Sequence, residues 1–263
     1  MNCKICNKET QKIFNHLVLN KYNVDYFFCN SCGFIQTEKP YWLKESYSDP
    51  IASIDTGIIK RNLLYAKRVS TVLYFLFDKN KTFLDFGGGN GLFVRMMRDV
   101  GFDFYWEDKF AKNLLSKGFE ISNNKNPIEL LTSFECFEHF VDPIGEISSL
   151  LKKSDSIMFS TQLFSNYPPK PDEWWYYNFE AGQHISLYSI KTLKVIANNF
   201  NLNLTSDYKG FHLLSKKKIN NTIFNFLVKF SLLGLASFVR LIMKSKTNSD
   251  MNYLKKLISN ENK

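Results

Sequence analysis

The sequence predicts an α/β domain in which helices cover both faces of a mostly parallel, doubly wound sheet. After residue 81, strand-type and helix-type patterns alternate along the chain. One apolar strand also runs directly into a cluster of glycines that opens a helix. The chain has 263 residues, of which 44% are hydrophobic, so it is long enough to bury a full-sized core and to carry a small additional module.

Apolar runs and helical spacing indicate the individual elements. A helix over 55–77 leads into the main domain, because its apolar residues recur at helical spacing. Strand patterns occupy 81–86, 102–107, 128–133, 156–161, 203–207 and 211–215. Helix patterns occupy 92–100, 111–117, 143–152 and 189–199. Ser189 is the expected N-cap of the last of these helices.

Four of the five cysteines form two C-x-x-C pairs near the start of the chain. The ligand set is Cys3, Cys6, Cys29 and Cys32, with 22 residues between the pairs. Each pair can turn so that two thiolates face one ion, and four thiolates in a tetrahedron suit Zn²⁺. Four protein ligands leave no open position, so we expect a structural zinc site rather than a catalytic one or a redox dithiol. Cys136 is expected to be a small buried apolar residue.

A glycine-rich loop follows the strand over 81–86. Asp85 precedes Gly87, Gly89 and Gly91 in the pattern D-x-G-x-G-x-G. Glycines let the backbone turn sharply and approach a ligand closely, and the following helix offers free N–H donors at its N-terminus. The loop therefore predicts a nucleotide-type cofactor. It fits the nicotinamide fingerprint poorly, because Leu92 stands where the third glycine should be, and it lacks the Gly-Lys-Ser/Thr of a P-loop.

This loop resembles motif I of class I methyltransferases, which holds S-adenosylmethionine. The resemblance implies a Rossmann-like fold with a mostly parallel seven-stranded sheet. It also implies a carboxylate on the ribose hydroxyls at the end of the next strand, where Glu107 and Asp108 stand. A carboxylate has two oxygens to accept from two hydroxyls, and we favour Asp108 for this role. A glycine turn without a ligand is the alternative interpretation.

The segment over 128–139 resembles the fourth strand of this family and its E-x-x-E-H loop. The resemblance implies that Ser133, Phe134 and Glu135 contact the cofactor. His139 follows at the expected C-terminal edge of the sheet. It either faces the reacting centre or is a hydrogen-bonded structural histidine, and we favour the structural role.

A long aromatic segment over 162–188 is expected to recognise the acceptor, because such loops at the ligand end of a sheet carry specificity. Its Trp-Trp-Tyr-Tyr run over 174–177 either stacks on the acceptor or packs the loop onto the domain. His184 is our leading candidate for a general base, since a neutral imidazole near pH 7 can take the proton of a hydroxyl. The alternative is a histidine that holds the loop through hydrogen bonds.

The combination of the two cysteine pairs, D-x-G-x-G-x-G, E-x-x-E-H, W-W-Y-Y and G-Q-H-I-S resembles methyltransferases of bacterial surface-glycan synthesis, over about residues 1–215. The zinc module is shared with sugar C-methyltransferases, but their large C-terminal domain is not found in this sequence. The resemblance implies O-methylation of a sugar, a nucleotide sugar or another small precursor of a capsule or lipopolysaccharide. A zinc-containing rRNA or tRNA methyltransferase and a non-catalytic binding or scaffold protein are the alternatives.

The net charge of +9 is concentrated near the end of the chain, where residues 208–249 contain eight basic and no acidic residues. The segment over 162–188 instead has one lysine and three acids, so we do not expect nucleic acid as the partner. The apolar, basic run over 222–243 predicts a C-terminal helix. Lys229 disfavours a true membrane span, so this helix is expected to dock on the domain or a partner, or to lie on a membrane surface.

Three parts are therefore expected: a zinc-binding module over 1–45, a methyltransferase domain over 46–218 and a helical basic tail over 219–263. The N-terminus lacks the basic start and apolar run of a secretory signal, so we expect the protein in the cytoplasm, with peripheral contact at the inner membrane. The identity of the acceptor, the methylated atom and the oligomeric state stay open at this point.

Overall fold

The computed structural model describes residues 1–47, 55–165 and 167–261, and Asn166 of the predicted aromatic segment lies outside them. The chain divides into two compact units, each built from segments far apart in the sequence. Unit 1 comprises Met1–Ser53 and Ser133–Lys218, and unit 2 comprises Ile54–Thr132 and Ile219–Lys263.

Three parallel strands form the centre of unit 2, in the order β5 (Asp103–Glu107), β4 (Thr82–Phe86) and β6 (Ile128–Ser133). Phe83 of β4 lies beside Phe104 and Leu130 on its two neighbours. All three side chains are fully buried. Strands that are covered on both faces are apolar throughout, instead of alternating between apolar and polar residues, and this explains the apolar runs in the sequence. The strands predicted over 81–86, 102–107 and 128–133 are confirmed.

Helices α2 (Ile58–Leu76) and α3 (Leu92–Val100) belong to unit 2 and pack on one another. The predicted helix over 55–77 is thus confirmed. Its buried side chains recur at helical spacing and include Tyr65, Ala66, Val69, Val72 and Leu73.

The tail continues unit 2 as α6 (Asn221–Phe230), a π-helical turn η5 (Ser231–Leu235) and α7 (Ala236–Ile242), all of which contact α2. Instead of one predicted helix, the chain is interrupted at Leu233 and Gly234, which have non-helical backbone angles. Gly234 has φ +114°, a conformation that L side chains rarely adopt.

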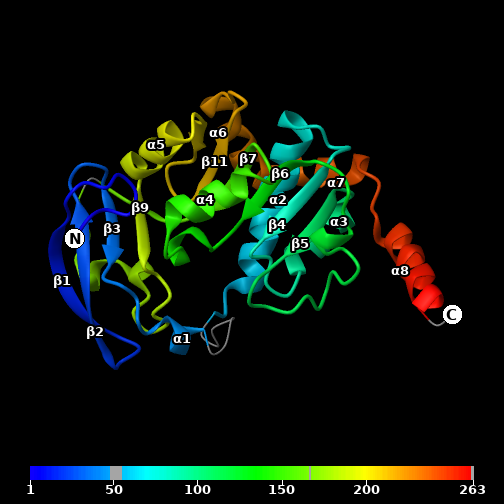
Figure 1. Cartoon of the computed structure of the whole chain (residues 1–263). Coiled ribbons are helices and arrows are strands. Elements are labelled where there is room, and N and C mark those ends of the chain that lie inside the picture. The colour runs from blue at the N-terminus through cyan, green and yellow to red at the C-terminus, as the bar shows by residue number, and fades with distance from the viewer. Residues whose placement is uncertain (48–54, 166, 262–263) are drawn as a thin grey trace. The chain divides into compact units, whose positions relative to one another are not determined.

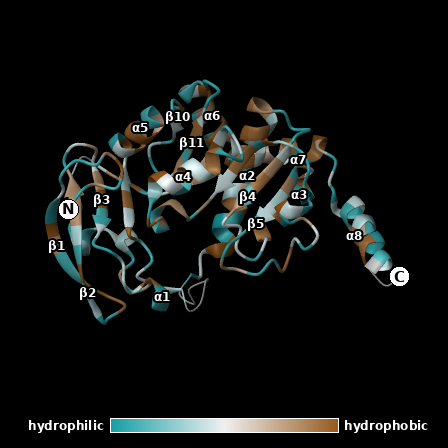
Figure 2. Cartoon of the chain, viewed as in Figure 1, coloured by the Kyte–Doolittle hydropathy of each residue, from teal (hydrophilic) through white to brown (hydrophobic). Residues whose placement is uncertain are grey.

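Helix α8 (Thr247–Glu261) is held to unit 2 by a buried ion pair. Arg98 of α3 donates from Nε and Nη2 to the two carboxylate oxygens of Asp250, each at 2.8 Å, and from Nη1 to Asp103 at 2.8 Å. Both members of the pair are buried, and most of the rest of α8 is hydrophilic (teal in Figure 2). Arg95, also on α3, donates to Asp250 at 2.8 Å, so two arginines join α8 to the first helix after the glycine loop.

The prediction of a helix over 111–117 is wrong, because these residues form no helix. Asn113 accepts hydrogen bonds from the backbone N–H and the hydroxyl of Ser116 and donates to Glu120, and such local side-chain bonds compete with a helix. The chain then makes one parallel bridge between Trp106 and Glu120 and a short 3₁₀ turn, η1 (Ile121–Asn123), where a further strand would have to lie.

Unit 1 contains the remaining strands of the predicted sheet, β7 (Ser156–Ser160), β11 (Phe211–Ser215) and β10 (Asn203–Ser206). Their pairings are antiparallel. The described residues thus have six of these strands, three in each unit, and the predicted mostly parallel sheet of seven strands is not confirmed. Helices α4 (Pro143–Leu151) and α5 (Ile190–Asn199) confirm two predicted helices. The Ser189 hydroxyl accepts from the backbone N–H of Thr192, as expected of an N-cap.

A second sheet in unit 1 joins the N-terminal segment to the aromatic segment. Its order is β1 (Gln11–Val18), β2 (Tyr22–Cys29), β3 (Phe34–Thr37), β9 (Ser186–Ser189) and β8 (Leu163–Phe164). Figure 1 shows β1, β2 and β3 side by side at the N-terminal end of the chain. Because β3 pairs with β9, residues 1–45 share one sheet with strands that follow residue 162. A short helix, α1 (Leu43–Ser46), completes the N-terminal segment.

Candidate functional site

The glycine loop, residues 87–91, connects β4 to α3 in unit 2. Gly87, Gly89 and Gly91 all have positive φ, at +72°, +52° and +83°. The loop is fixed to the end of β5, because the backbone N–H groups of Gly87 and Gly88 both donate to the carbonyl of Glu107, at 2.9 and 3.2 Å. The three predicted glycines are thus the positions at which the backbone needs left-handed angles.

Open space lies in front of the middle of the loop. No atom of the described residues lies within 4 Å of the position that a Cβ would take on Gly89. By contrast, a Cβ on Gly91 would collide with Ser116, and one on Gly88 would come within 2.8 Å of Asp85 and Trp106. Gly89 is therefore the point at which a ligand can approach the backbone directly.

Asp108 is bound to the loop itself. Its Oδ2 accepts from the backbone N–H of Gly89 at 2.9 Å, and its Oδ1 accepts from the N–H groups of Phe110 and Ala111, each at 2.7 Å. The carboxylate thereby holds the loop and the turn after β5 in place. Glu107, the last residue of β5, is half-buried, and its backbone carbonyl accepts from the N–H groups of Gly87 and Gly88.

Asp85 is a buried support beneath the loop. Its Oδ1 accepts from the hydroxyl of Thr132 on the adjacent strand β6, at 2.7 Å. Burial raises the pKa of Asp85 to about 7, and the nearby negative charge of Asp108 adds to this shift, while the Thr132 hydrogen bond opposes it. This predicted site residue thus lies below the loop, in the core of unit 2.

The end of β6 and the turn that follows it have several features of a ligand-binding turn. Unit 1 includes these residues from Ser133 onward. The Ser133 hydroxyl is buried, and the described residues offer it no hydrogen-bond partner. Glu135 has a left-handed backbone with φ +53°, held by its N–H, which donates to Ser160, and by its carboxylate, which accepts from the same hydroxyl. Phe134 stacks on Phe211, with ring centroids 6.0 Å apart. Backbone strain and an unsatisfied buried hydroxyl are typical of functional sites.

Unit 1 also brings together Glu138, His139 and His184, which we call the histidine cluster. Their ligand atoms all lie within 4.8 Å of one another, and the two imidazole centroids are 5.1 Å apart. The backbone N–H of Ile185 donates to the carbonyl of Glu138 at 2.9 Å, which joins the Gly-Gln-His segment to the E-x-x-E-H loop. A carboxylate beside two imidazoles can transfer a proton or hold a divalent cation.

Each imidazole of the cluster is oriented by a tyrosine. The Nδ1 of His184 lies 2.6 Å from the backbone carbonyl of Tyr176, and the Nδ1 of His139 lies 3.0 Å from the Tyr47 hydroxyl. Since a carbonyl can only accept, the Nδ1 of His184 carries the proton and its Nε2 is the basic nitrogen. Burial lowers the pKa of His139 well below its usual value, and neighbouring His184 lowers it further, so His139 is neutral at pH 7.

The aromatic run over 174–177 separates into two roles. Tyr176 and Tyr177 are buried in a cluster with Trp42 and Tyr26, so they pack the segment onto the second sheet. Trp175 is 76% exposed and can meet a ligand. The packing role is therefore confirmed for Tyr176 and Tyr177, and stacking on the acceptor stays a prediction for Trp175.

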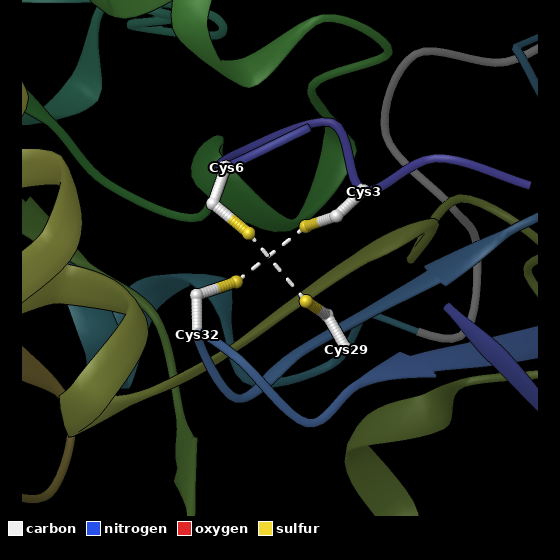
Figure 3. Close-up of side chains that lie close together, drawn as sticks. All are labelled: Cys3, Cys6, Cys29 and Cys32. Atoms are coloured by element: carbon white, nitrogen blue, oxygen red, sulfur yellow. Dashed lines mark hydrogen bonds between the residues drawn. The ribbon is translucent and has the colours of Figure 1, made fainter. Parts of the chain in front are cut away.

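The four predicted cysteine ligands converge in unit 1. Their sulfur atoms all lie within 4.8 Å of one another, with Cys3 and Cys32 at 3.4 Å and Cys6 and Cys29 at 3.5 Å. Figure 3 shows all four side chains pointing toward a common centre. Cys136 lies elsewhere, half-buried, with its Sγ donating to the Phe134 carbonyl, so the sequence separates it correctly from the four.

Trp106 and Tyr47 are site residues that the sequence analysis missed. The indole N–H of Trp106 donates to the Gly89 carbonyl at 2.9 Å and so supports the glycine loop. Tyr47 reaches His139 from a position 92 residues earlier in the chain. The only available signal for Trp106 was its place next to Glu107 at the end of a strand, and no local pattern pointed to Tyr47.

The raised pKa of Asp85 predicts how stability depends on pH. The folded carboxyl titrates near 7 and the unfolded one near 3.8, so the folded state binds the extra proton between these values and loses stability as the pH rises through them. Asp85→Asn removes this effect. We compare the free energy of unfolding of the variant with that of the unmodified protein. The difference should favour the variant by a few kcal/mol more at pH 8 than at pH 4.5, since one unit of pKa shift corresponds to about 1.4 kcal/mol.

Denaturant unfolding at both pH values measures this difference. Asp155→Asn serves as the control, because Asp155 is an exposed partner of Lys216 on the surface. It should leave the pH dependence unchanged. If the free energy of unfolding of Asp85→Asn changes with pH as that of the unmodified protein does, Asp85 is charged in the folded state over this pH range.

Comparison with known proteins places this geometry in a family. A family model described as a methyltransferase domain matches residues 59–207, more than half of the 263 residues. Comparison with curated proteins finds no significant match.

Several solved structures are similar to parts of this chain at low sequence identity. The plantazolicin methyltransferase BpumL in complex with SAH is 13% identical, with a TM-score of 0.46 over 68% of this chain and 95% of that chain. The magnesium protoporphyrin IX methyltransferase ChlM from Synechocystis PCC 6803 is 11% identical, with a TM-score of 0.41 over 65% and 90%. An O-methyltransferase family protein from Burkholderia thailandensis is 10% identical, with a TM-score of 0.46 over 70% and 65%.

The strand, glycine loop and helix of motif I fall inside the matched residues, as do the turn after β6 and the histidine cluster. The chain belongs to the methyltransferase domain family.

Proposed function

We propose that unit 2 binds S-adenosylmethionine on the glycine loop. The observation that carries this proposal is the open space at Gly89, in a loop whose backbone is otherwise fixed by β5 and by Asp108. With Asp108 occupied by three backbone N–H groups, Glu107 is the carboxylate that we assign to the ribose hydroxyls. Ser133, Phe134 and Glu135 are our candidates for further cofactor contacts.

Gly89→Ala tests the cofactor site. A methyl group there meets no neighbour in the free protein, so the expected loss of stability is only the cost of a left-handed alanine, about 1–2 kcal/mol. The same methyl group occupies the space that the cofactor requires. We therefore expect affinity for S-adenosylmethionine to fall by about tenfold or more, measured by isothermal titration calorimetry.

Gly234→Ala is the matched control, because Gly234 also has positive φ and open space but lies in the tail of unit 2. It should lower stability and leave cofactor affinity unchanged. If Gly89→Ala binds the cofactor normally, the loop is not its binding site.

We further propose that the acceptor is a small sugar-type molecule, methylated on oxygen, as a step in the synthesis of a bacterial surface polysaccharide. The support is the sequence resemblance, together with a histidine cluster of the kind that removes a hydroxyl proton. In this proposal the Nε2 of His184 takes the proton of the acceptor hydroxyl, while its Nδ1 stays hydrogen-bonded to Tyr176. Transfer joins the methyl carbon to the acceptor oxygen and leaves S-adenosylhomocysteine. The exposed Trp175 is a candidate for stacking on a sugar ring.

A transfer assay with labelled S-adenosylmethionine tests this proposal against a panel of sugar nucleotides and small glycan precursors, with products identified by mass spectrometry. With the acceptor found, His184→Gln should lower kcat by about 100-fold or more and change KM little. His139→Gln separates the two histidines, and we expect a smaller loss from it. His16→Gln, on β1, is the control.

Near-normal turnover of His184→Gln would show that His184 holds the loop rather than acting as a base. Label found in tRNA or rRNA, rather than in the small-molecule panel, would favour the RNA methyltransferase alternative. A folded chain that binds no S-adenosylmethionine would favour a scaffold role.

We also propose that the four cysteines hold a structural Zn²⁺. The support is the set of four sulfur donors, which all lie within 4.8 Å of one another. The backbone beside them is tightly turned, since Gly33 has φ +72° and its N–H donates to the carbonyl of Cys29 at 2.7 Å. The backbone N–H of Ile5 also points to the sulfur of Cys3, at 3.4 Å. When bound, zinc would join the N-terminal residues to the β2–β3 turn, with no coordination position left for a substrate.

Metal analysis of the purified protein should find about one zinc per chain. Cys6→Ser should lose the metal and lower the melting temperature, because metal binding contributes folding free energy. Cys136→Ser, the fifth cysteine, should keep the metal. A metal-free protein that unfolds at the same temperature with or without added zinc would contradict the proposal.

A further inference from the structure

One surface of unit 2 is unusually apolar, and it lies on the tail. Of the 24 large hydrophobic side chains exposed among the described residues, eight lie within Asn221–Ile242, a stretch of 22 residues. Their exposed fractions run from 37% to 84%. We call them the apolar tail face: Ile223, Phe226, Phe230, Leu232, Leu233, Phe238, Leu241 and Ile242.

The apolar tail face is distinct from the side of the tail that packs on unit 2. Phe224, Leu227 and Val228 of α6 are buried, and α6 contacts α2. Ile223, Phe226 and Phe230 recur at helical spacing on another side of α6 and are exposed. The rings of Phe226 and Phe230 stack, with centroids 4.3 Å apart. A helix on the surface of a water-soluble protein normally presents polar residues on this side, so the face is built to meet an apolar environment.

The backbone of this segment argues for contact with a bilayer surface rather than a span. By length and hydropathy alone, Asn221–Ile242 could cross a membrane. However, the helix is interrupted at Leu233 and Gly234, and a third of its most apolar window is buried against the protein. The break presents Leu232 and Leu233 to solvent between two helices that remain packed on α2.

The charges around the face select the kind of partner. Lys229, Arg240 and Lys244 are exposed, and residues 219–249 contain no acidic residue. Two copies of this face brought together would oppose like charges, whereas an anionic surface would neutralise them. A nucleic acid would match the charge but not the exposed leucine and phenylalanine side chains.

We propose that the apolar tail face docks unit 2 on the surface of a bilayer that contains anionic lipids. Its apolar side chains enter the boundary between the headgroups and the acyl chains, and the basic residues lie at the level of the lipid phosphates. This attachment does not depend on the cofactor or the acceptor. It would hold the enzyme at the surface on which membrane-linked precursors are assembled.

The experiment uses the full chain and vesicles of phosphatidylethanolamine and phosphatidylglycerol, compared with vesicles of phosphatidylcholine, in a co-sedimentation assay without cofactor. We expect binding to the anionic vesicles, weakened by salt. Leu233→Gln combined with Leu241→Gln changes the two most exposed residues of the face, at 68% and 84% exposure, and should weaken binding by about tenfold or more. Lys229→Glu combined with Arg240→Glu should weaken binding similarly and reduce its salt dependence.

Ile258→Gln is the matched control, because Ile258 is a 60% exposed residue on α8, outside the face. It should bind as the unmodified protein does, and melting temperatures establish that all variants are folded. Deletion of the whole tail is a poorer test, since it would uncover α2 and leave Arg98 without Asp250.

Three results would overturn the proposal. The first is an unmodified protein that does not sediment with anionic vesicles, and the second is undiminished binding by the double leucine variant. The third is a lipid-free dimer that the leucine variant converts to a monomer, which would assign the face to a second copy of the chain.

Discussion

The left-handed backbone at Gly87, Gly89 and Gly91 is the constraint on which the connection from β4 to α3 depends. A loop that turns this sharply is stable only because its N–H groups find acceptors at the end of β5, namely the Glu107 carbonyl and the Asp108 carboxylate. The same bonds leave the space at Gly89 open. The stability of the loop and the open space at Gly89 thus come from one set of contacts.

The histidine cluster of unit 1 depends on the N-terminal segment. Tyr47 lies against His139, and Trp42 donates its indole N–H to the Gly182 carbonyl at 2.8 Å. The side chain of Gln183, next to His184, donates to the Ser46 carbonyl at 2.8 Å. The cysteine module is therefore continuous with the residues that orient both imidazoles.

The tail shows how one segment can serve two environments. One side of α6 and α7 stabilises unit 2 by packing on α2, and the Arg98–Asp250 pair keeps α8 attached beyond it. A buried ion pair of this kind is costly to break, because a buried charge would lose one of its two charged partners. The other side stays apolar and exposed, and it is this side that needs an explanation outside the fold.

The sequence by itself determined the features that depend on near neighbours. The glycine loop, the four cysteine ligands, the α2 helix and the Ser189 cap were all predicted, because strand, turn and cap preferences act over a few residues. The tertiary structure decided what depends on distant partners, such as the β3–β9 pairing and the Arg98–Asp250 pair, whose members are 152 residues apart. It also decided that Asp108 holds the loop, since its carboxylate meets the Gly89 N–H, 19 residues earlier, only once β4 and β5 lie side by side.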